Sequence, residues 1–538
     1  MAQAWRGFVQ RAFSPSIGLG VGAPPNRGDG SEPALPEESG ALACGLFVRL
    51  LGGVYLLAFA SLWPQLAGLV GDAGVLPAAP FLRAVAEQLG AQRFVRLPTL
   101  FWLGSSDDAL HLCCGLGMVC AILVIAGRLW WPALAALWAC YLSLVSVGRD
   151  FLSFQWDTLL LETGFLTLVL VPCRPLWRAA RTFVPAGRWL LLLLLWRLLF
   201  GAGWVKLRSG DPTWRDLSAL HYHFQTQPLP TWLGYYAHRL PSALKRLSVL
   251  AMFAIELGVP LLIAIGGALR CLPHRQRLGR RLHLASFFLL TGLMVIIAAT
   301  GNYGFFNILT VVLGVPLLPD AWLRRILPGQ SRTAQAPASA YAPTLGVVLR
   351  GICAGILFLL GSAQALSLFV RRDELPEPLE TLVAHTAPFH LSSRYGLFAV
   401  MTTTRPEIIL EGSLDGKTWT PYEFKYKPGA PQRAPRFCAP HQPRLDWQMW
   451  FAALGPPQDS PWLQGLCIRL LQGKPEVLWL LQRDPFAGRP PRYLRALIYS
   501  YRFTTAAERA ATGAYWHRDE TGAPGASPIY FGPVSLSE

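Results

Sequence analysis

The sequence predicts a polytopic α-helical membrane bundle of about nine spans, followed by a soluble β-rich domain with helical insertions. Three observations lead to this fold class. Of the 538 residues, 52% are hydrophobic and only 15% are charged, whereas ordinary soluble domains carry about 25% charged residues. Apolar runs long enough to cross a bilayer recur through most of the chain. After residue 385, turn signals instead separate short runs of β-forming residues.

The chain divides into three parts. Residues 1–42 contain arginines and a Pro/Gly-rich stretch but lack the apolar core and cleavage site of a secretory signal, so we expect a flexible cytosolic leader. Residues 43–372 are expected to form the multi-span helical membrane domain. Residues 373–538 are expected to form the β-rich C-terminal domain on the exoplasmic side of the membrane.

The apolar spans are expected to follow one another with short connections. The run at 303–318 is short, and three arrangements are open for it: a tilted helix, a re-entrant segment or a continuation of its neighbour. Eight or ten spans are therefore alternatives to nine. The expected spans are 44–70, 109–127, 130–148, 151–171, 188–207, 246–268, 282–300, 303–318 and 344–370.

The distribution of arginine predicts the orientation in the membrane. The loops at 172–188, 269–281 and 319–343 are rich in arginine, and a chain of nine spans places them on the same side as the N-terminus. Short basic loops face the cytosol. The N-terminus is therefore expected in the cytosol and the C-terminal domain in the lumen or periplasm. The same distribution explains the net charge of +17 without nucleic acid as a partner.

The region after the last span changes character. Residues 405–429 predict a strand, a turn at Leu414–Lys417 and a second strand. Residues 446–454 and 462–472 predict helices, and 495–504 predict a further strand.

Several ionisable residues lie inside the apolar spans. Such residues are costly in a bilayer and need a partner, a proton or a water-filled cavity. Asp157 and Glu162 are five residues apart, which on a helix is a separation of about 140°, so they do not form a carboxylate pair that shares a proton. We expect them to pair with Arg149, Arg197 or Lys206. The intramembrane charged residues are Asp157, Glu162, Arg197, Lys206 and Glu256.

Lys206 is the candidate base. A lysine desolvated at the end of an apolar span can have a lowered pKa and accept a proton. The alternative is that its ammonium group extends to the membrane surface and anchors the helix. No companion catalytic group is identifiable by spacing, so no catalytic residue is assigned.

The sequence predicts no metal site and no cofactor. His221 and His223 would share one side of an extended segment, but no third ligand lies within reach in the sequence. The motifs of zinc proteases, serine hydrolases and nucleotide-binding loops do not occur. Of the ten cysteines, only Cys438 and Cys467 belong to the C-terminal domain, and they could form a disulfide there.

Read together, several long motifs resemble the lipase maturation factor family. In the membrane part the resemblance rests on SFQWDTLLLETGFL at 153–166, FGAGWVKLRSGDPTWRDLSALHYHFQTQPLP at 200–230 and TGNYGFFNILT at 300–310. In the C-terminal part it rests on PEIILEGSLDGKTWTPYEFKYKPG at 406–429, APHQPRLDWQMWFAAL at 439–454 and DPFAGRPPRYLRALIYSYRF at 484–503.

The resemblance implies a membrane-resident, chaperone-like maturation factor that assists the folding and assembly of secreted lipases or other exported clients. It implies the endoplasmic reticulum membrane in a eukaryotic host and the inner membrane in a bacterial one. The C-terminal domain would engage the client, with Trp447, Trp450 and Phe451 as candidate contacts, although a core role suits them equally. The client and the oligomeric state are left open.

A more remote similarity concerns Ala202, Gly203, Lys206 and Trp214, which match a span of vitamin K-dependent gamma-carboxylases. This similarity implies that Lys206 is an active-site base, and it keeps open the alternative of a membrane enzyme. A maturation factor without enzymatic activity is the preferred interpretation.

Overall fold

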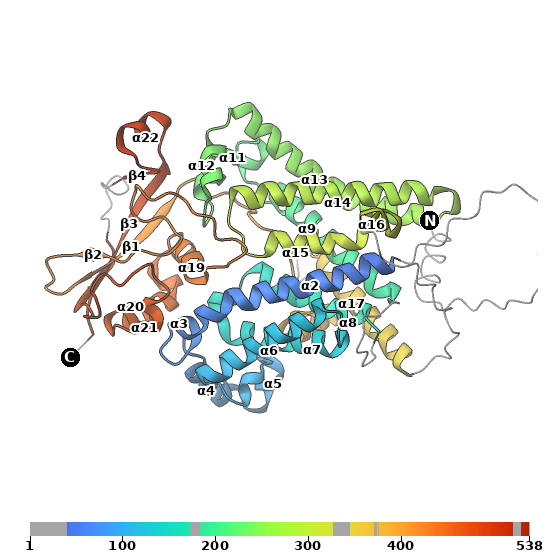
Figure 1. Cartoon of the computed structure of the whole chain (residues 1–538), viewed down its shortest axis with the longest axis horizontal. Coiled ribbons are helices and arrows are strands. Elements are labelled where there is room, and N and C mark those ends of the chain that lie inside the picture. Colours follow the sequence, from blue (N-terminus) through green and yellow to red (C-terminus); the bar gives the residue numbers. More distant parts are fainter. Residues whose placement is uncertain are drawn as a thin grey trace, which may run out of the picture.

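The computed structural model describes residues 40–172, 183–326, 345–370, 374, 376–519 and 529–536. A helical bundle forms most of the molecule, and a smaller domain of helices and strands is packed on one end of it (Figure 1). Nearly all of the expected leader, residues 1–39, lies outside the described residues.

Seven of the described helices are long and apolar enough to cross a membrane. They are α2 (Ala41–Leu62), α6 (Asp107–Ile125), α7 (Trp130–Gly148), α9 (Pro185–Arg208), α13 (Ser242–Arg270), α14 (Gln276–Thr300) and α17 (Leu345–Leu366). An eighth span is possible in the bent pair Phe306–Leu317 and Asp320–Ile326, whose axes differ by 114°. The fold is therefore a membrane bundle, as the sequence predicts.

Two of the expected spans are shorter than a bilayer is thick. Helix α8 (Gln155–Leu170) has 16 residues and extends about 24 Å, and α15 (Phe306–Gly314) has only nine. Helix α15, together with its flanking turns, nevertheless connects the two ends of the bundle. The turn after α15 reaches the start of α2, because Ala43 N donates to Asp320 Oδ1 at 3.1 Å, and the turn before α15 reaches the C-terminal domain through Asn302.

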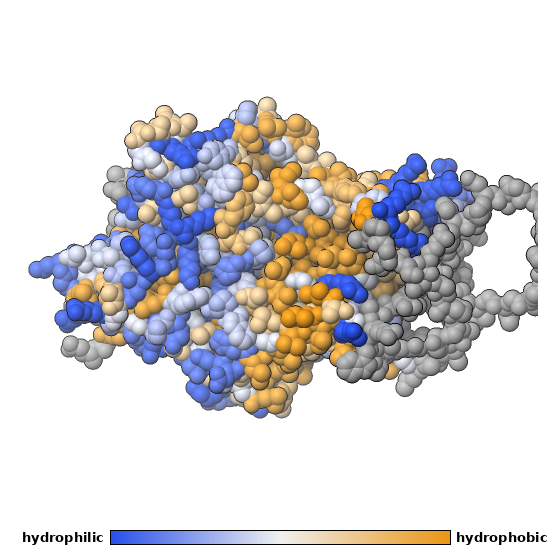
Figure 2. Space-filling model, in the orientation of Figure 1, coloured by the Kyte–Doolittle hydropathy of each residue, from blue (hydrophilic) through white to orange (hydrophobic). Residues whose placement is uncertain are grey.

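We call the end of the bundle that holds Ala43 and Asp320 the basic end, and the end that touches the C-terminal domain the domain end. Arg188 and Pro316 also meet at the basic end, where the arginine donates to the carbonyl at 2.6 Å. The apolar side chains lie over the bundle, between the polar C-terminal domain on the left and a smaller hydrophilic group on the right (Figure 2). This band is the surface expected to face lipid.

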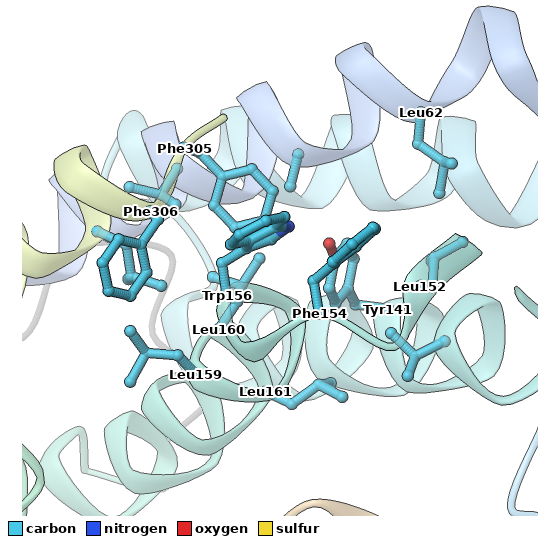
Figure 3. Close-up of a cluster of buried hydrophobic side chains, with 14 of the residues drawn as sticks. Leu62, Tyr141, Leu152, Phe154, Trp156, Leu159, Leu160, Leu161, Phe305 and Phe306 are labelled. Atoms are coloured by element: carbon cyan, nitrogen blue, oxygen red, sulfur yellow. The ribbon is translucent and has the colours of Figure 1, made fainter. Parts of the chain in front are cut away.

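Helix α8 can be short because protein, rather than lipid, surrounds it. Most of its side chains are buried, and backbone that ends at membrane depth is tolerated inside protein. Trp156 lies between Phe305 and Phe154 in a cluster that also includes Tyr141 (Figure 3). The rings of Phe154 and Trp156 are stacked with their centroids 4.7 Å apart. These contacts hold the start of α8 at the domain end of the bundle.

The C-terminal domain contains one antiparallel sheet in the order β2-β1-β3-β4, with β5 also paired to β3. The strands are β1 (Pro406–Ser413), β2 (Thr420–Pro421), β3 (Tyr493–Phe503), β4 (Trp516–Asp519) and β5 (Ile529–Val534). The predicted turn is present: Asp415 accepts hydrogen bonds from the amides of Lys417 and Thr418, and Gly416 has a φ of +73°. The second strand of this hairpin is shorter than the sequence predicts.

The helices of the C-terminal domain lie against this sheet and against the bundle. The two predicted ones are α19 (Arg444–Ala452) and α20 (Pro461–Leu471). Shorter helices lie in the same domain and in the connections at the two ends of the bundle. They are α3 (Leu66–Val70), α4 (Ala78–Leu89), α5 (Arg93–Arg96), α10 (Pro212–Arg215), α11 (Leu220–Thr226), α12 (Trp232–His238), α16 (Asp320–Ile326), α18 (Glu377–Thr386), α21 (Pro475–Leu478) and α22 (Ala506–Thr512).

Candidate functional site at the domain junction

The junction between the bundle and the C-terminal domain contains a fully buried ion pair. Asp157, in the first turn of α8, accepts two hydrogen bonds from Arg444 of α19, at 2.5 and 2.8 Å. Tyr141 donates to the same carboxylate at 2.5 Å, and Arg444 also donates to the carbonyl of Phe151 at 3.0 Å. Both charged side chains are almost completely excluded from solvent. A bidentate pair of this kind fixes the orientation of both partners.

Sequence reasoning missed this partner. We expected Asp157 and Glu162 to pair with Arg149, Arg197 or Lys206. This prediction is wrong for Asp157, whereas Glu162 does pair with Arg197. The guanidinium of Arg149 lies over the ring of Phe81 instead. Arg444 lies 287 residues from Asp157, within the residues 373–538 that the sequence assigned to the C-terminal domain. The only signal in the sequence was a basic residue at the start of a helix rich in aromatic side chains.

The electrostatics of the pair are favourable despite the burial. Burial by itself lowers the pKa of Arg444, but the carboxylate of Asp157 more than offsets this and holds that pKa above its ordinary value. The charge of Asp157 also lies in the first turn of α8, where the helix dipole stabilises an anion.

The end of α2 supports the same helix of the C-terminal domain. Gln65 accepts from the amide of Arg444 at 2.9 Å and donates to the carbonyl of Gln442 at 2.9 Å. Ser61 accepts from the amide of Gln442 at 2.8 Å and lies 2.9 Å from Nδ1 of His441. The segment before α19 is therefore hydrogen-bonded to the first helix of the bundle over several residues.

The connections at the domain end hold the other side of the domain. Asn302 donates to the carbonyls of Leu229 and Arg436 and accepts from the amide of Cys438 at 2.8 Å. Arg405, which is also paired with Glu407, donates to three carbonyls at the end of α11 and in its connection to α12. Its acceptors are the carbonyls of Gln225, Gln227 and Pro228. The junction is thus an ordered polar interface, not a flexible tether.

Glu162 and Arg197 form a second buried pair, between α8 and α9. The carboxylate of Glu162 also accepts from the hydroxyl of Tyr395 at 2.6 Å and from the amide of Ser393 at 3.0 Å. Arg197 donates to the carbonyl of Ser393 at 3.3 Å. This pair therefore connects the bundle to the first segment of the C-terminal domain, as the first pair connects it to α19.

Lys206 forms the third pair, with Glu256 of α13. Its ammonium group lies 2.9 Å from each carboxylate oxygen and 3.1 Å from the carbonyl of Ala202. It also lies 5.5 Å from the centre of the Trp214 ring. An ammonium group has three protons to donate, so the three oxygens use all of them. Lys206 is buried, which differs from the exposed anchor that one interpretation of the sequence predicted.

His221 and His223 lie on a helix, whereas their shared orientation, considered from the sequence, requires an extended segment. Both belong to α11, and His221 contacts the carbonyl of Ser218 at 3.0 Å. His223 is partly buried, its Nε2 lies 3.1 Å from the hydroxyl of Tyr303, and desolvation lowers its pKa to about 4. Within the described ranges, no group of three His, Cys, Asp or Glu side chains is arranged to hold a metal ion.

The three candidate client contacts do not share one environment. Trp447 and Trp450 are buried, and Trp450 donates to the carbonyl of Thr226 at 2.8 Å. Trp447 packs edge-on against Trp156, with the centroids 4.8 Å apart. Both tryptophans belong to the junction, and only Phe451, at 45% exposure, presents its ring to solvent.

Cys438 and Cys467 are free thiols in the structure. Cys467 is buried in α20, whereas the backbone amide of Cys438 donates to the side chain of Asn302. The structure therefore does not join the two cysteines, and an intact-mass measurement tests whether both are free.

Comparison with known proteins connects both parts of this structure to one family. Residues 42–325 match the model of the lipase maturation factor transmembrane domain, and residues 391–524 match the model of the lipase maturation factor C-terminal domain.

The chain belongs to the lipase maturation factor family. It is 36% identical over 596 residues to lipase maturation factor 2 of Gallus gallus, an alignment that covers 91% of this chain and 80% of the relative. Lipase maturation factor 2 of Homo sapiens is 36% identical over 88% of this chain and 80% of its own. Lipase maturation factor 1 of Homo sapiens is 34% identical over 96% and 92%. No solved structure matches the chain.

Membership of the lipase maturation factor family agrees with the integral membrane bundle described above. Both family models meet at the junction, because Asp157 lies in the first and Arg444 in the second. The junction is therefore formed between the two modules that the family model separates.

Proposed function

We propose that this chain is a membrane-resident maturation factor that assists the folding of a secreted lipase without catalysing a reaction. The observation that carries the proposal is that the models of both lipase maturation factor domains match this one chain, at residues 42–325 and 391–524. The names of the relatives supply the client class. Transient binding of a folding client needs exposed apolar groups on a domain that faces the client. The C-terminal domain lies outside the apolar band that faces lipid, and it exposes the ring of Phe451.

The geometry around Lys206 favours a binding role over the alternative of a carboxylase-like enzyme. A general base must accept a proton, whereas this ammonium group already donates to the carboxylate of Glu256 and to the carbonyl of Ala202. The pair connects α9 to α13, and loss of only one partner would leave a buried, uncompensated charge.

A secretion assay tests the proposal. In cells that lack members of this family, the chain would be expressed together with a secreted lipase, and the lipase activity per unit of secreted lipase protein would be measured. We expect an increase of several-fold over cells with an empty vector. The double variant Lys206→Met with Glu256→Met removes both charges, and replacement of a buried pair by apolar side chains is often tolerated. It should retain most of this increase. Wild-type abundance with complete loss of lipase maturation in the double variant would instead support the enzyme.

We further propose that the protein resides in the endoplasmic reticulum, with the basic end of the bundle in the cytosol and the C-terminal domain in the lumen. The basic end carries Arg275, Arg280, Arg281 and Arg324 with few acidic residues, which is the pattern of a cytosolic face. Cys271 is an exposed thiol at that end, and Lys417 is exposed on the C-terminal domain.

These two positions provide a topology assay. In sealed microsomes with the cytosolic face outward, a membrane-impermeant maleimide should label Cys271 directly. A cysteine introduced as Lys417→Cys in a chain with Cys173→Ser and Cys271→Ser should be labelled only after the membrane is permeabilised. Labelling of the introduced cysteine in sealed vesicles would reverse the proposed orientation.

A further inference from the structure

Two neighbouring cavities lie at the domain end of the bundle, where α9 and α17 end. The larger has a volume of about 550 Å³ and lies between the ends of these helices and residues 399–400. The smaller, of about 340 Å³, lies between α17, α18 and residues 390–394. Ser367 and Arg394 line both cavities, so the two adjoin at the end of α17, and we call them together the recess.

Among the residues that the structure describes, the charged side chains lining the recess are Arg208 and Arg394, and none of the lining side chains is acidic. One nitrogen of Arg208 donates to the carbonyls of Leu368 and Phe369, at 2.6 and 2.9 Å, which holds the guanidinium at the cavity while its other nitrogen atoms remain available. Arg394 is exposed and has no side-chain partner among the described residues. Two like charges around one cavity repel each other unless an anion lies between them.

The remaining lining is largely apolar. Trp204, Val205 and Leu368 come from the ends of the two helices, and Val400 contributes a side chain that is 66% exposed. Helix α17 is mostly unburied within the protein along its apolar span, so its outer face meets lipid. Tryptophan is enriched where hydrocarbon gives way to headgroups. The recess therefore lies at the depth of lipid headgroups and combines a basic part with an apolar part.

We propose that this recess binds a phospholipid with a net negative charge, whose phosphate lies between Arg208 and Arg394 and whose acyl chains follow the outer face of α17. Guanidinium groups are the preferred donors to phosphate oxygens. The apolar lining favours a lipid over a small anion, because inorganic phosphate has no apolar groups that could pack against Val205 and Val400. A bound lipid would fill the space between the bundle and the first residues of the C-terminal domain.

Native mass spectrometry of the full chain in detergent tests the proposal. The protein would be titrated with dioleoyl phosphatidylserine, with dioleoyl phosphatidylcholine and, separately, with inorganic phosphate. We expect one phosphatidylserine to bind at concentrations where phosphatidylcholine and inorganic phosphate do not. Equal binding of the two lipids would refute recognition of the negative charge. Binding of inorganic phosphate as tight as that of phosphatidylserine would refute the proposal that the ligand is a lipid.

Three variants locate the site. Arg208→Gln and Arg394→Gln should each weaken the binding of phosphatidylserine by about tenfold or more, since each removes charge-assisted hydrogen bonds. Val400→Asp should also weaken it, because it places a carboxylate at an exposed position of the recess without disturbing the core. The matched control is Arg96→Gln, an exposed arginine of α5 outside the recess, which should leave binding unchanged. If the control and the recess variants behave alike in folded, monodisperse samples, the assignment is wrong.

Discussion

Replacement of Arg444 by alanine removes one partner of the ion pair that joins the C-terminal domain to the bundle. The variant leaves the carboxylate of Asp157 buried with the hydroxyl of Tyr141 as its remaining polar contact. Loss of one partner of a fully buried pair costs about 3–5 kcal/mol. For a domain of this size, a change of 1 kcal/mol shifts the midpoint of thermal unfolding by about 3 °C, so the expected decrease is roughly 10–15 °C.

The assay is thermal unfolding of the detergent-purified chain, followed by tryptophan fluorescence. Arg495→Ala provides the control, because its pair with Glu411 lies in the same domain but is partly exposed. Such pairs contribute about 0–1 kcal/mol, so this control should unfold within about 3 °C of the wild type.

The double variant Arg444→Leu with Asp157→Leu decides between an unpaired charge and a lost contact as the cause of the decrease. It removes both charges, so it should recover a large part of the stability that Arg444→Ala loses. Our reasoning would be refuted by an unfolding midpoint for Arg444→Ala that matches the Arg495→Ala control. It would also fail if the double variant were no more stable than Arg444→Ala.

Three further predictions concern the same domain. Trp450→Ala should lower the unfolding midpoint strongly, because truncation of a buried aromatic costs about 3–5 kcal/mol. Phe451→Ala should change the midpoint little, and it should reduce lipase maturation if that exposed ring contacts the client. Equal losses of stability in the two variants would contradict the burial described here. Burial, together with the charges of Arg444 and Lys425, lowers the pKa of His441 to about 4. The unfolded chain therefore binds a proton near pH 6.5 that the folded chain does not, and stability should fall from about pH 6.5 to 4. This fall should be smaller in His441→Asn, and a pH dependence equal to the wild type would exclude His441 as its source. Intact mass after denaturation and alkylation without reductant should show adducts on both Cys438 and Cys467, which a disulfide between them would prevent.

The positions of the helices and the sheet could be predicted from the sequence because their signals are local. The free energy of transferring a side chain into hydrocarbon is a property of each residue and its close neighbours, so apolar runs identify spans without knowledge of the fold. The turn at Asp415 and Gly416 and the helices at 446–454 and 462–472 also follow from short-range patterns. The length of α8 was harder to predict from the sequence, since Phe306 and Trp447, which pack against Trp156 of α8, come from distant segments.

The partners of the buried charges depend on the tertiary structure. The sequence by itself determined that Asp157 needed compensation, because a carboxylate in an apolar span is costly wherever it lies. It did not determine that Arg444 supplies this compensation, since the two residues are 287 positions apart and the charge of an arginine carries no information about its eventual neighbour. Likewise, only the packing of α9 against α13 brings Glu256 to Lys206. The physical reason is that burial can be estimated residue by residue. An ion pair instead requires two side chains to be close in space, and only the tertiary structure determines which distant residues are close.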